Sequence, residues 1–351
     1  MGRKVRVGIT RDMFDKDMKP ITPGPGLKLL DAMPNVEYKI WDQYLVEATP
    51  EQIKSFDVLI VLKPKFTEKT VAGNDRLLAI HRNGVGYDTI DVPAMTRAGV
   101  MLTITPEAVR RPMAVAIVTF LLALSTRIFV KDKITRAGKG WEERARYHGI
   151  GLVGRTFGSI GVGNIGHEAF KLAKPFDMKH IAYDPYVKQS VVDDVGVKLV
   201  DMDTVLSESD FLNVSVPLSD KTLHLVSENE FKKMKKTAFI INTARGPIID
   251  EKVLIKALQE GWIQGAGIDV FEQEPTSPDN PLLKMENVIV APHALGWTDQ
   301  VFMNEWDQML RQIAEIARGD VPEGLVNRGV LESPIFKAKF EKFLRATKQV
   351  L

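Results

Sequence analysis

A glycine-rich turn constrains the fold of this chain more than any other feature of its sequence. The turn reads Gly161-Val162-Gly163-Asn164-Ile165-Gly166; it follows an apolar run at 157–160 and precedes a helix-forming run at 165–173. A strand, a tight turn and a helix in this order open a βαβ unit in which a pyrophosphate rests on the helix N-terminus. Gly161 permits the turn, Gly163 lets the backbone approach the phosphates, and Gly166 lets helix and strand pack closely. The motif therefore predicts a dinucleotide-binding site.

An acidic residue supports this prediction and narrows it. Asp184 ends the next strand-like run, 23 positions after Gly161. A carboxylate at this place accepts hydrogen bonds from the adenosine ribose and repels a 2′-phosphate. We therefore predict NAD rather than NADP as the cofactor. Lys188 lies close enough to Asp184 in sequence to leave the strictness of this preference open.

Strand-like and helix-like runs alternate along most of the chain, which predicts parallel α/β sheets. A first series has strands at 5–9, 36–40 and 57–62, with helices at 26–33 and 50–55. The run at 57–62 is almost continuously apolar, as expected for a strand covered on both faces. A second series contains six predicted strands, the number typical of a dinucleotide-binding domain. These six strands are 157–160, 180–183, 211–216, 237–242, 265–269 and 287–290.

The domain boundaries follow from two long helices and from the length of 351 residues, which suits two domains. An apolar helix at 110–127 separates the two series, and an amphipathic helix at 299–318 follows the second. We predict one discontinuous domain of residues 1–108 and 297–351 and another of residues 109–296. The tail at 336–351 is expected to form a short surface helix.

Composition excludes several classes of protein. The net charge of +2, with 44% hydrophobic and 26% charged residues, indicates a globular protein without a nucleic-acid footprint. The absence of cysteine removes disulfides and thiolate chemistry and fits a reducing compartment. The N-terminus has no signal-peptide apolar stretch, and the longest apolar run, 113–124, is too short to span a bilayer. We expect a cytoplasmic protein that binds neither membranes nor nucleic acid.

Three polar segments follow predicted strands of the second series. They are Asn242-Thr243-Ala244-Arg245-Gly246, the run from Asp269 through Glu274 to Pro275, and Ala291-Pro292-His293. Side chains just past the carboxyl ends of parallel strands converge on one crevice. In this order, together with the glycine turn, the motifs resemble those of the D-2-hydroxyacid dehydrogenases. The resemblance covers about residues 1–330 and includes the runs Arg82–Asp91 and Val216-Pro217-Leu218.

The resemblance implies a role for each matching residue. Arg245 would hold the substrate carboxylate and polarise the adjacent carbonyl. His293 would exchange a proton with the substrate oxygen, and Glu274 would pair with His293. We choose Glu274 over Glu272 because Glu274 precedes Pro275, as in the family motif. The remaining implied contacts are to the substrate, through Asn83, Gly84, Val85 and Gly86, and to the cofactor, through Asn164, Ile165, Val216, Pro217, Thr243, Ala244, Asp269 and His293.

The implied protein is an NAD-dependent oxidoreductase that interconverts a 2-oxoacid and a D-2-hydroxyacid. Residues 109–296 would form the Rossmann domain for NAD, the remainder a flavodoxin-like substrate domain, and the substrate would lie between them. A homodimer through the NAD-binding domains, with 138–151 contributing, is also expected. The alternatives are a dehydrogenase of phosphite or of a phosphorylated hydroxyacid, and an NADH-sensing protein like the corepressors of this fold. Formate dehydrogenases of similar fold carry Gln where this chain has Glu274, which argues against that activity.

Two features remain outside these assignments. Many family members carry a glutamate where this chain has Val115, and Arg110 and Arg111 lie nearby. These arginines either cap a helix against solvent or attract the pyrophosphate or a second acidic group of the substrate. The other histidines are interpreted as surface or packing residues and have no metal-binding spacing, so we predict no metal; they are His81, His148, His167, His180 and His224.

Overall fold

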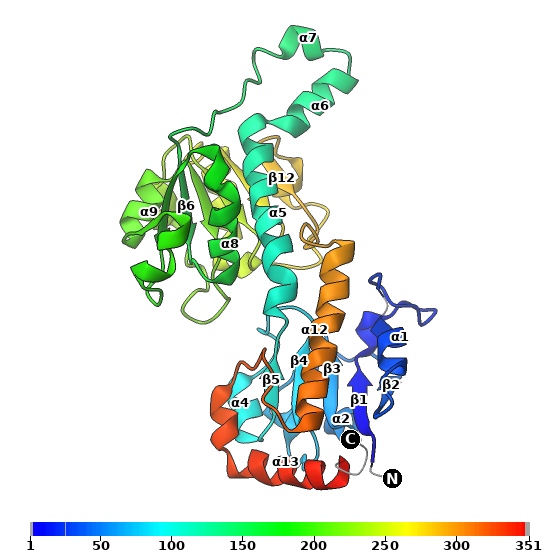
Figure 1. Ribbon diagram of the computed structural model, residues 1–351. Helices are drawn as coiled ribbons and strands as arrows, with labels where there is room; N and C mark the ends of the chain where they lie inside the picture. Colours follow the sequence, from blue (N-terminus) through cyan, green and yellow to red (C-terminus); the bar gives the residue numbers. More distant parts are fainter. Residues whose placement is uncertain (1–2, 25, 348–351) are drawn as a thin grey trace. The chain divides into compact units, whose positions relative to one another are not determined.

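The computed structural model describes residues 3–24 and 26–347 of the chain, and it divides into two compact units (Figure 1). Unit 1 consists of Met1–Val109 and Thr298–Leu351, and unit 2 is Arg110–Trp297. These boundaries differ by one residue from the predicted ones, 108/109 and 296/297. The discontinuous unit arises because the chain returns to unit 1 through the amphipathic helix α12 (Asp299–Arg318).

Unit 1 contains a five-stranded sheet in the order β2-β1-β3-β4-β5, with every pair parallel. This order is that of the flavodoxin-like fold, as predicted. The sequence patterns indicated β1 to β3 but missed β4 and β5, because these two strands are short and β4 carries His81 and Arg82. The strands are β1 (Val5–Ile9), β2 (Val36–Ile40), β3 (Val58–Val61), β4 (Ala79–Arg82) and β5 (Met101–Thr103).

The helices of unit 1 begin at recognisable caps. Thr49 and Gln52 form a capping box at α2, Asp91 accepts the N–H of Ala94 at α4, and Thr298 caps α12. The apolar side of α12 packs on the sheet. The helix predicted at 336–351 is present as α13, which begins two residues earlier. Residues 348–351 lie outside the described part of the chain. Besides α12, these helices are α1 (Gly26–Asp31), α2 (Pro50–Ile53), α3 (Glu68–Val71), α4 (Val92–Arg97) and α13 (Pro334–Thr347).

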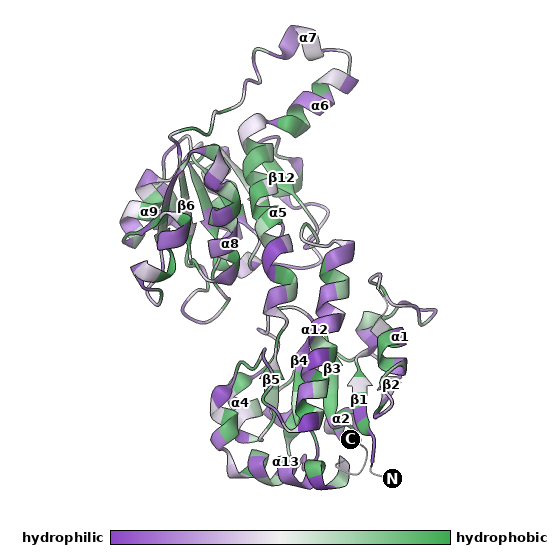
Figure 2. Cartoon of the chain, in the orientation of Figure 1, coloured by the Kyte–Doolittle hydropathy of each residue, from purple (hydrophilic) through white to green (hydrophobic). Residues whose placement is uncertain are grey.

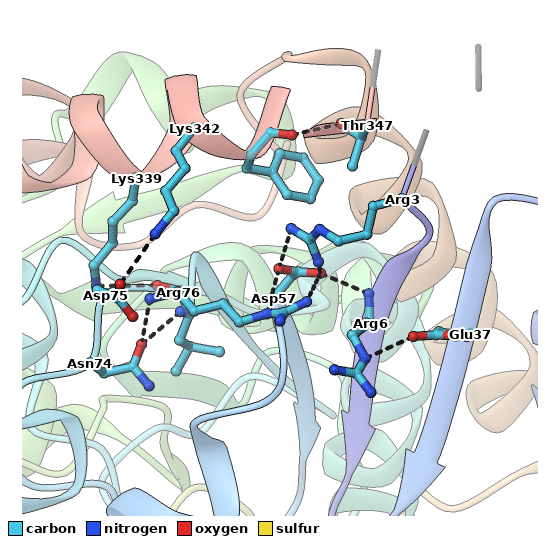
Figure 3. A network of polar contacts seen from close by, with 12 residues as sticks. Arg3, Arg6, Glu37, Asp57, Asn74, Asp75, Arg76, Lys339, Lys342 and Thr347 are labelled. Atoms are coloured by element: carbon cyan, nitrogen blue, oxygen red, sulfur yellow. Dashed lines mark hydrogen bonds and ion pairs between the residues drawn. The ribbon is translucent and has the colours of Figure 1, made fainter. Parts of the chain in front are cut away.

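A buried carboxylate joins the amino-terminal ends of strands in unit 1 (Figure 3). Asp57 is 1% exposed and directly precedes β3. Arg3 donates two hydrogen bonds to it at 2.7 and 3.0 Å, and Arg76 donates two more at 3.1 and 3.4 Å. The backbone N–H of Arg6, on β1, donates a further one at 2.8 Å. Because all its lone pairs have charged or backbone donors, this carboxylate can remain buried.

Unit 2 contains a seven-stranded parallel sheet in the order β12-β11-β10-β9-β6-β7-β8. This is the Rossmann order with one further strand, β12, at an edge. The prediction of six strands was wrong by one, since β8 has only three residues and lies at the other edge. The strands are β6 (Thr156–Ile160), β7 (Lys179–Tyr183), β8 (Val197–Leu199), β9 (Phe211–Val214), β10 (Phe239–Asn242), β11 (Gly265–Ile268) and β12 (Val288–Val290).

The most apolar helix, α5 (Pro106–Thr126), begins in unit 1 and packs in unit 2. Figure 2 shows that most of this helix is hydrophobic. Its residues Ile117, Phe120 and Leu121 lie in the core of unit 2. Among the described residues it alone is long and apolar enough to cross a membrane, but 61% of its most apolar window is buried. It is therefore a core helix. The other helices of unit 2 are α6 (Ile128–Arg136), α7 (Gly140–Glu143), α8 (Asn164–Ala173), α9 (Met202–Glu208), α10 (Glu228–Lys233) and α11 (Glu251–Gln259).

Substituting Asp57 by Ala should lower the free energy of unfolding by about 3 kcal/mol, because it leaves two arginines and a backbone N–H without their common acceptor. Asp75→Ala is the matched control: this carboxylate is 82% exposed and pairs with Lys342 at 3.2 Å. Its loss should change stability by at most about 0.5 kcal/mol. Urea unfolding of both variants measures the difference. Equal effects would contradict a structural role for the buried network.

Candidate active site

The register of the sheet in unit 2 gathers the polar turns at one edge. Ile160 at the end of β6 lies opposite both Tyr183 of β7 and Val214 of β9. At the same level, Asn242 of β10 lies opposite Ile268 of β11, which in turn lies opposite Val290 of β12. Since all seven strands are parallel, the turns that follow these residues leave the sheet together. This edge carries the predicted site residues of unit 2.

The three glycines of the turn do three different things. Gly161 has φ +87°, and a Cβ there would collide with the Ser215 carbonyl after β9. A Cβ at Gly166 would lie 3.0 Å from the Gly161 carbonyl oxygen, so helix α8 packs tightly on the turn. Gly163 is the N-cap of α8, and a Cβ there would meet no atom within 4 Å. Open space beside a helix N-terminus fits the pyrophosphate of a dinucleotide.

Asp184 is held beside this turn by backbone donors. Its carboxylate accepts the N–H of Val162 at 3.0 Å and that of Tyr186 at 2.9 Å. One bond reaches each oxygen, and each oxygen keeps a lone pair for a further donor. Asp184 therefore sits where the ribose of a bound dinucleotide is expected.

Arg245 leaves the end of β10 in a turn that its own neighbours fix. The side chain of Asn242 accepts the N–H of Ala244 at 3.0 Å and donates to the carbonyl of Arg245 at 2.9 Å. Arg245 Nη1 donates to the Ala244 carbonyl at 2.8 Å. The buried asparagine thus shapes the backbone on which the guanidinium is carried.

Glu274 and His293 form a hydrogen-bonded pair, with 2.7 Å between Glu274 Oε2 and His293 Nδ1. The other carboxylate oxygen of Glu274 accepts the N–H of Phe271 at 3.1 Å. The side chains are 38% and 44% exposed, respectively, so a small molecule can reach the ring. With Nδ1 engaged, Nε2 is the ring nitrogen that can act on a substrate.

The surroundings keep Glu274 ionised. Burial raises the pKa of its carboxyl. The hydrogen bond and charge of His293, the Phe271 N–H and the charge of Arg245 together lower this pKa by more than burial raises it. The net shift of the pKa is downward. The carboxylate of Glu274 orients the His293 ring through the hydrogen bond at Nδ1.

Asp269, which was predicted to contact the cofactor, organises the turn that carries His293. The N–H of His293 donates to the Asp269 carbonyl at 2.7 Å, and the Asp269 carboxylate accepts the N–H groups of Ala294 and Leu295 at 3.0 and 3.2 Å. These bonds hold His293 at φ +55°, a left-handed conformation that residues with a Cβ seldom adopt. Burial raises the pKa of Asp269, and the two backbone N–H groups oppose this.

A close backbone approach connects Arg245 to Glu274. A Cβ on Gly246 would overlap the carbonyl group of Phe271 and the N–H of Glu272. Only glycine fits here, and the turn of Arg245 therefore rests directly on the segment whose Phe271 N–H holds Glu274. Sequence reasoning assigned no role to Gly246; its place directly after Arg245 was the available signal.

The predicted substrate loop, Asn83 to Gly86, follows β4 in unit 1. The N–H of Asn83 donates to the Val61 carbonyl at 2.9 Å, and the N–H of Gly84 donates to Thr105 Oγ1 at 3.0 Å. The Gly84 N–H is thus already used within the unit. Within the described residues, the N–H groups of Val85 and Gly86 have no acceptor, so the prediction of a carboxylate-binding loop rests on these two.

The other predicted cofactor residues also lie at the carboxyl edge of the sheet. Val216 and Pro217 follow β9, and Val216 lies against Gly161. Thr243 and Ala244 follow β10. Asn164 and Ile165 form the first turn of α8. Their contacts with a dinucleotide remain predictions.

The remaining histidines and arginines differ in their surroundings. His81 and His180 are buried, whereas His167 pairs with Asp194 at 2.8 Å. His224, interpreted from the sequence as a surface or packing residue, contacts the carboxylate of Glu272. Arg111 donates to Glu168 of α8 at 2.5 Å and lowers the pKa of that carboxyl, so its charge is compensated within unit 2.

Replacing Gly163 by Ala should weaken NADH binding at least about tenfold while leaving the melting temperature unchanged, because the added methyl group occupies only the space for the pyrophosphate. Fluorescence titration with NADH and thermal unfolding measure the two quantities. Gly329→Ala, at another open glycine in unit 1, is the control and should alter neither. Unchanged NADH affinity in Gly163→Ala would rule out this binding mode.

Comparisons with known proteins show the family to which the chain belongs. Residues 118–294 match the family described as D-isomer specific 2-hydroxyacid dehydrogenase, NAD binding domain. A glyoxylate reductase of Korarchaeum cryptofilum is 35% identical over 94% of this chain and 98% of its own length. A D-3-phosphoglycerate dehydrogenase of Methanocaldococcus jannaschii is 38% identical over 86% of this chain but 57% of its own length.

The fold also matches a solved structure. The D-lactate dehydrogenase of Aquifex aeolicus, complexed with NAD and lactic acid, has a TM-score of 0.79 and 25% identity, covering 92% of this chain and 99% of that one. The chain belongs to the D-isomer specific 2-hydroxyacid dehydrogenases and is an NAD(P)-dependent oxidoreductase that interconverts 2-oxoacids and 2-hydroxyacids.

Proposed function

We propose that this enzyme reduces a short 2-oxoacid to the D-2-hydroxyacid, with Arg245, Glu274 and His293 as its catalytic residues. The hydrogen bond of 2.7 Å between Glu274 and His293 carries this proposal. It leaves Nε2 of His293 to deliver a proton to the substrate oxygen, or to receive one in the reverse direction. The His293 ring is half-exposed, so a substrate can reach it while Glu274 keeps its position.

The three side chains divide the work by their chemistry. Arg245 binds the substrate carboxylate and polarises the neighbouring carbonyl through its planar, permanently charged guanidinium. Glu274 accepts a hydrogen bond from His293 and holds the ring in one orientation. When bound, the nicotinamide cofactor supplies the hydride that reduces the carbonyl carbon. His293 holds the proton that neutralises the developing alkoxide.

Glyoxylate is the substrate that we propose first. Support comes from the glyoxylate reductase of Korarchaeum cryptofilum, which this chain matches over 98% of that protein's length. The phosphoglycerate dehydrogenase matched above is covered over only 57% of its length. Within unit 2, the ion pair of Arg111 with Glu168 leaves less positive charge for a second acidic group on the substrate. A small unphosphorylated oxoacid fits these observations.

Substitutions at the proposed catalytic residues should separate binding from proton transfer. Arg245→Ala should raise KM for glyoxylate about 100-fold, because a charge-assisted bidentate contact contributes about 3 kcal/mol. His293→Asn should lower kcat by about 10²- to 10⁴-fold with little change in KM. Spectrophotometric NADH oxidation with glyoxylate, hydroxypyruvate, pyruvate and bulkier acids measures both.

The control for these variants is Lys232→Ala, which removes an exposed cation of unit 2 and should leave kcat and KM unchanged. NADH binding without turnover of any oxoacid would favour the sensor protein instead. Turnover of phosphite or of a phosphorylated hydroxyacid in preference to the panel would favour those dehydrogenases. Full activity in His293→Asn would contradict the assignment of the proton donor.

We propose NAD as the preferred cofactor, because the carboxylate of Asp184 lies beside the glycine turn and repels a 2′-phosphate. The wild-type enzyme should then favour NADH over NADPH at least about 100-fold in kcat/KM, and Asp184→Ser should reduce this ratio at least about tenfold. Kinetics with both cofactors measure the ratio. Lys188→Ala, which changes an exposed cation nearby, should leave NADH preferred. A wild-type preference for NADPH would overturn the proposal.

We further propose a cytoplasmic homodimer. In Figure 1, α6 and α7 form an arm beyond the sheet of unit 2. A small cluster of Val130, Ile134 and Tyr147 holds this arm, whose Phe129 and Trp141 are 61% and 80% exposed. Exposed aromatic side chains on such an arm fit an interface with a second copy of the chain.

A chain without cysteine suits the reducing cytoplasm.

A further inference from the structure

A second histidine of unit 2 resembles His293 in two respects but plays no part in the proposed chemistry. His224 has φ +50°, and its Nε2 contacts the carboxylate of Glu272. Its Nδ1 lies 3.9 Å from Asp250 Oδ2, so the ring lies between two carboxylates. The left-handed backbone is costly for a residue with a Cβ, and such conformations persist where the surroundings enforce them.

His224 joins the segments that carry Arg245 and Glu274, two of the three proposed catalytic residues. Its own N–H donates to the Pro247 carbonyl at 2.8 Å, directly after the turn of Arg245 and Gly246. The side chain of His224 then reaches Glu272, which lies between Phe271 and Glu274 in sequence. One residue thus contacts the Arg245 turn through its backbone and the Glu274 segment through its ring.

The Arg245 turn and the Glu274 segment also touch each other directly, at a glycine. The Cα of Gly246 rests on the peptide between Phe271 and Glu272. The N–H of Phe271 fixes one oxygen of Glu274, and the other oxygen holds His293. A shift of the Phe271–Glu272 peptide away from Gly246 would therefore move the catalytic carboxylate relative to Arg245.

We propose that the His224–Glu272 pair is a positioning device that presses the Glu274 segment against the Arg245 turn. This inference rests on the proposed roles of Arg245, Glu274 and His293. His224 touches neither reacting atoms nor cofactor in this assignment; it acts through Glu272. The pair sets the geometry in which the substrate carboxylate and the proton donor are presented together.

Other anchors limit the size of the effect. Glu251, at the start of α11, accepts the N–H of Glu272 at 2.9 Å and the side-chain N–H of Asn280 at 2.7 Å. The Glu274 segment therefore stays attached to the domain when His224 is lost. We expect a loosened rather than an unfolded segment, and catalysis that is impaired rather than abolished.

The test compares His224→Ala with His224→Gln in the full-length enzyme. His224→Ala should lower kcat/KM for glyoxylate about tenfold, weaken binding of the unreactive analogue oxamate, and speed hydrogen exchange across 270–280, while the Kd for NADH changes less than twofold. His224→Gln should restore most of each value, because the glutamine amide nitrogen extends to the place of Nε2 and keeps an N–H donor for Glu272.

A double-mutant cycle identifies the partner. Because the two side chains act as a unit, His224→Ala combined with Glu272→Ala should lose no more activity than either single variant. Asp194→Ala is the matched control, since it breaks a histidine–carboxylate pair of unit 2 that lies outside the proposed site, at His167, and should leave kcat/KM unchanged. If His224→Ala does not fold, Glu272→Ala gives the same readouts, because it removes the same contact without changing a residue of left-handed backbone.

Several outcomes would overturn the proposal. Unchanged kcat/KM and unchanged exchange at 270–280 in His224→Ala would do so, as would additive losses in the double variant. A loss of activity matched by equal losses of NADH affinity and melting temperature would indicate a general structural role. Full activity in His293→Asn would contradict the catalytic assignment itself, whereas its inactivity beside a fully active His224→Ala would contradict only the positioning role.

Discussion

The parallel register of the seven-stranded sheet is the constraint on which the site in unit 2 depends. With β6 paired to β7 and β9, the glycine turn, Asp184 and the turn after β9 leave the sheet at one level. With β10, β11 and β12 in register beside them, Arg245, Glu274 and His293 follow at the same edge. Hydrogen bonds between parallel strands thereby bring together residues up to 132 positions apart in the chain.

Backbone groups do most of the positioning at this edge. Asp184 is held by two N–H groups, Glu274 by one, and His293 by the turn that the Asp269 carboxylate closes. Backbone donors on a rigid sheet hold a carboxylate more firmly than flexible side chains do, because they lose little further conformational freedom. The His293 ring can then stay half-exposed and still be oriented.

Carboxylates have opposite purposes in the two units. Asp57 is buried under two arginines and organises the strand ends of unit 1, so its charge is fully used inside the fold. Glu274 accepts one backbone N–H and pairs with His293, which stays open to solvent. The difference lies in what covers each group, since the same hydrogen-bond chemistry stabilises structure when buried and supports proton transfer when accessible.

Local patterns in the sequence indicate the fold class and the glycine turn, because strand periodicity and turn chemistry are local, whereas Arg245, Glu274 and His293 were singled out by the resemblance of their motifs to a family. These local patterns did not reveal β4, β5 and β8, whose three or four residues form strands only because neighbours offer them partners. The folded chain was needed to see that Gly246 lies on Phe271, that Asp269 closes the His293 turn, and that His224 contacts Glu272. Such contacts join residues 24 to 48 positions apart, and no local pattern encodes the distance between them.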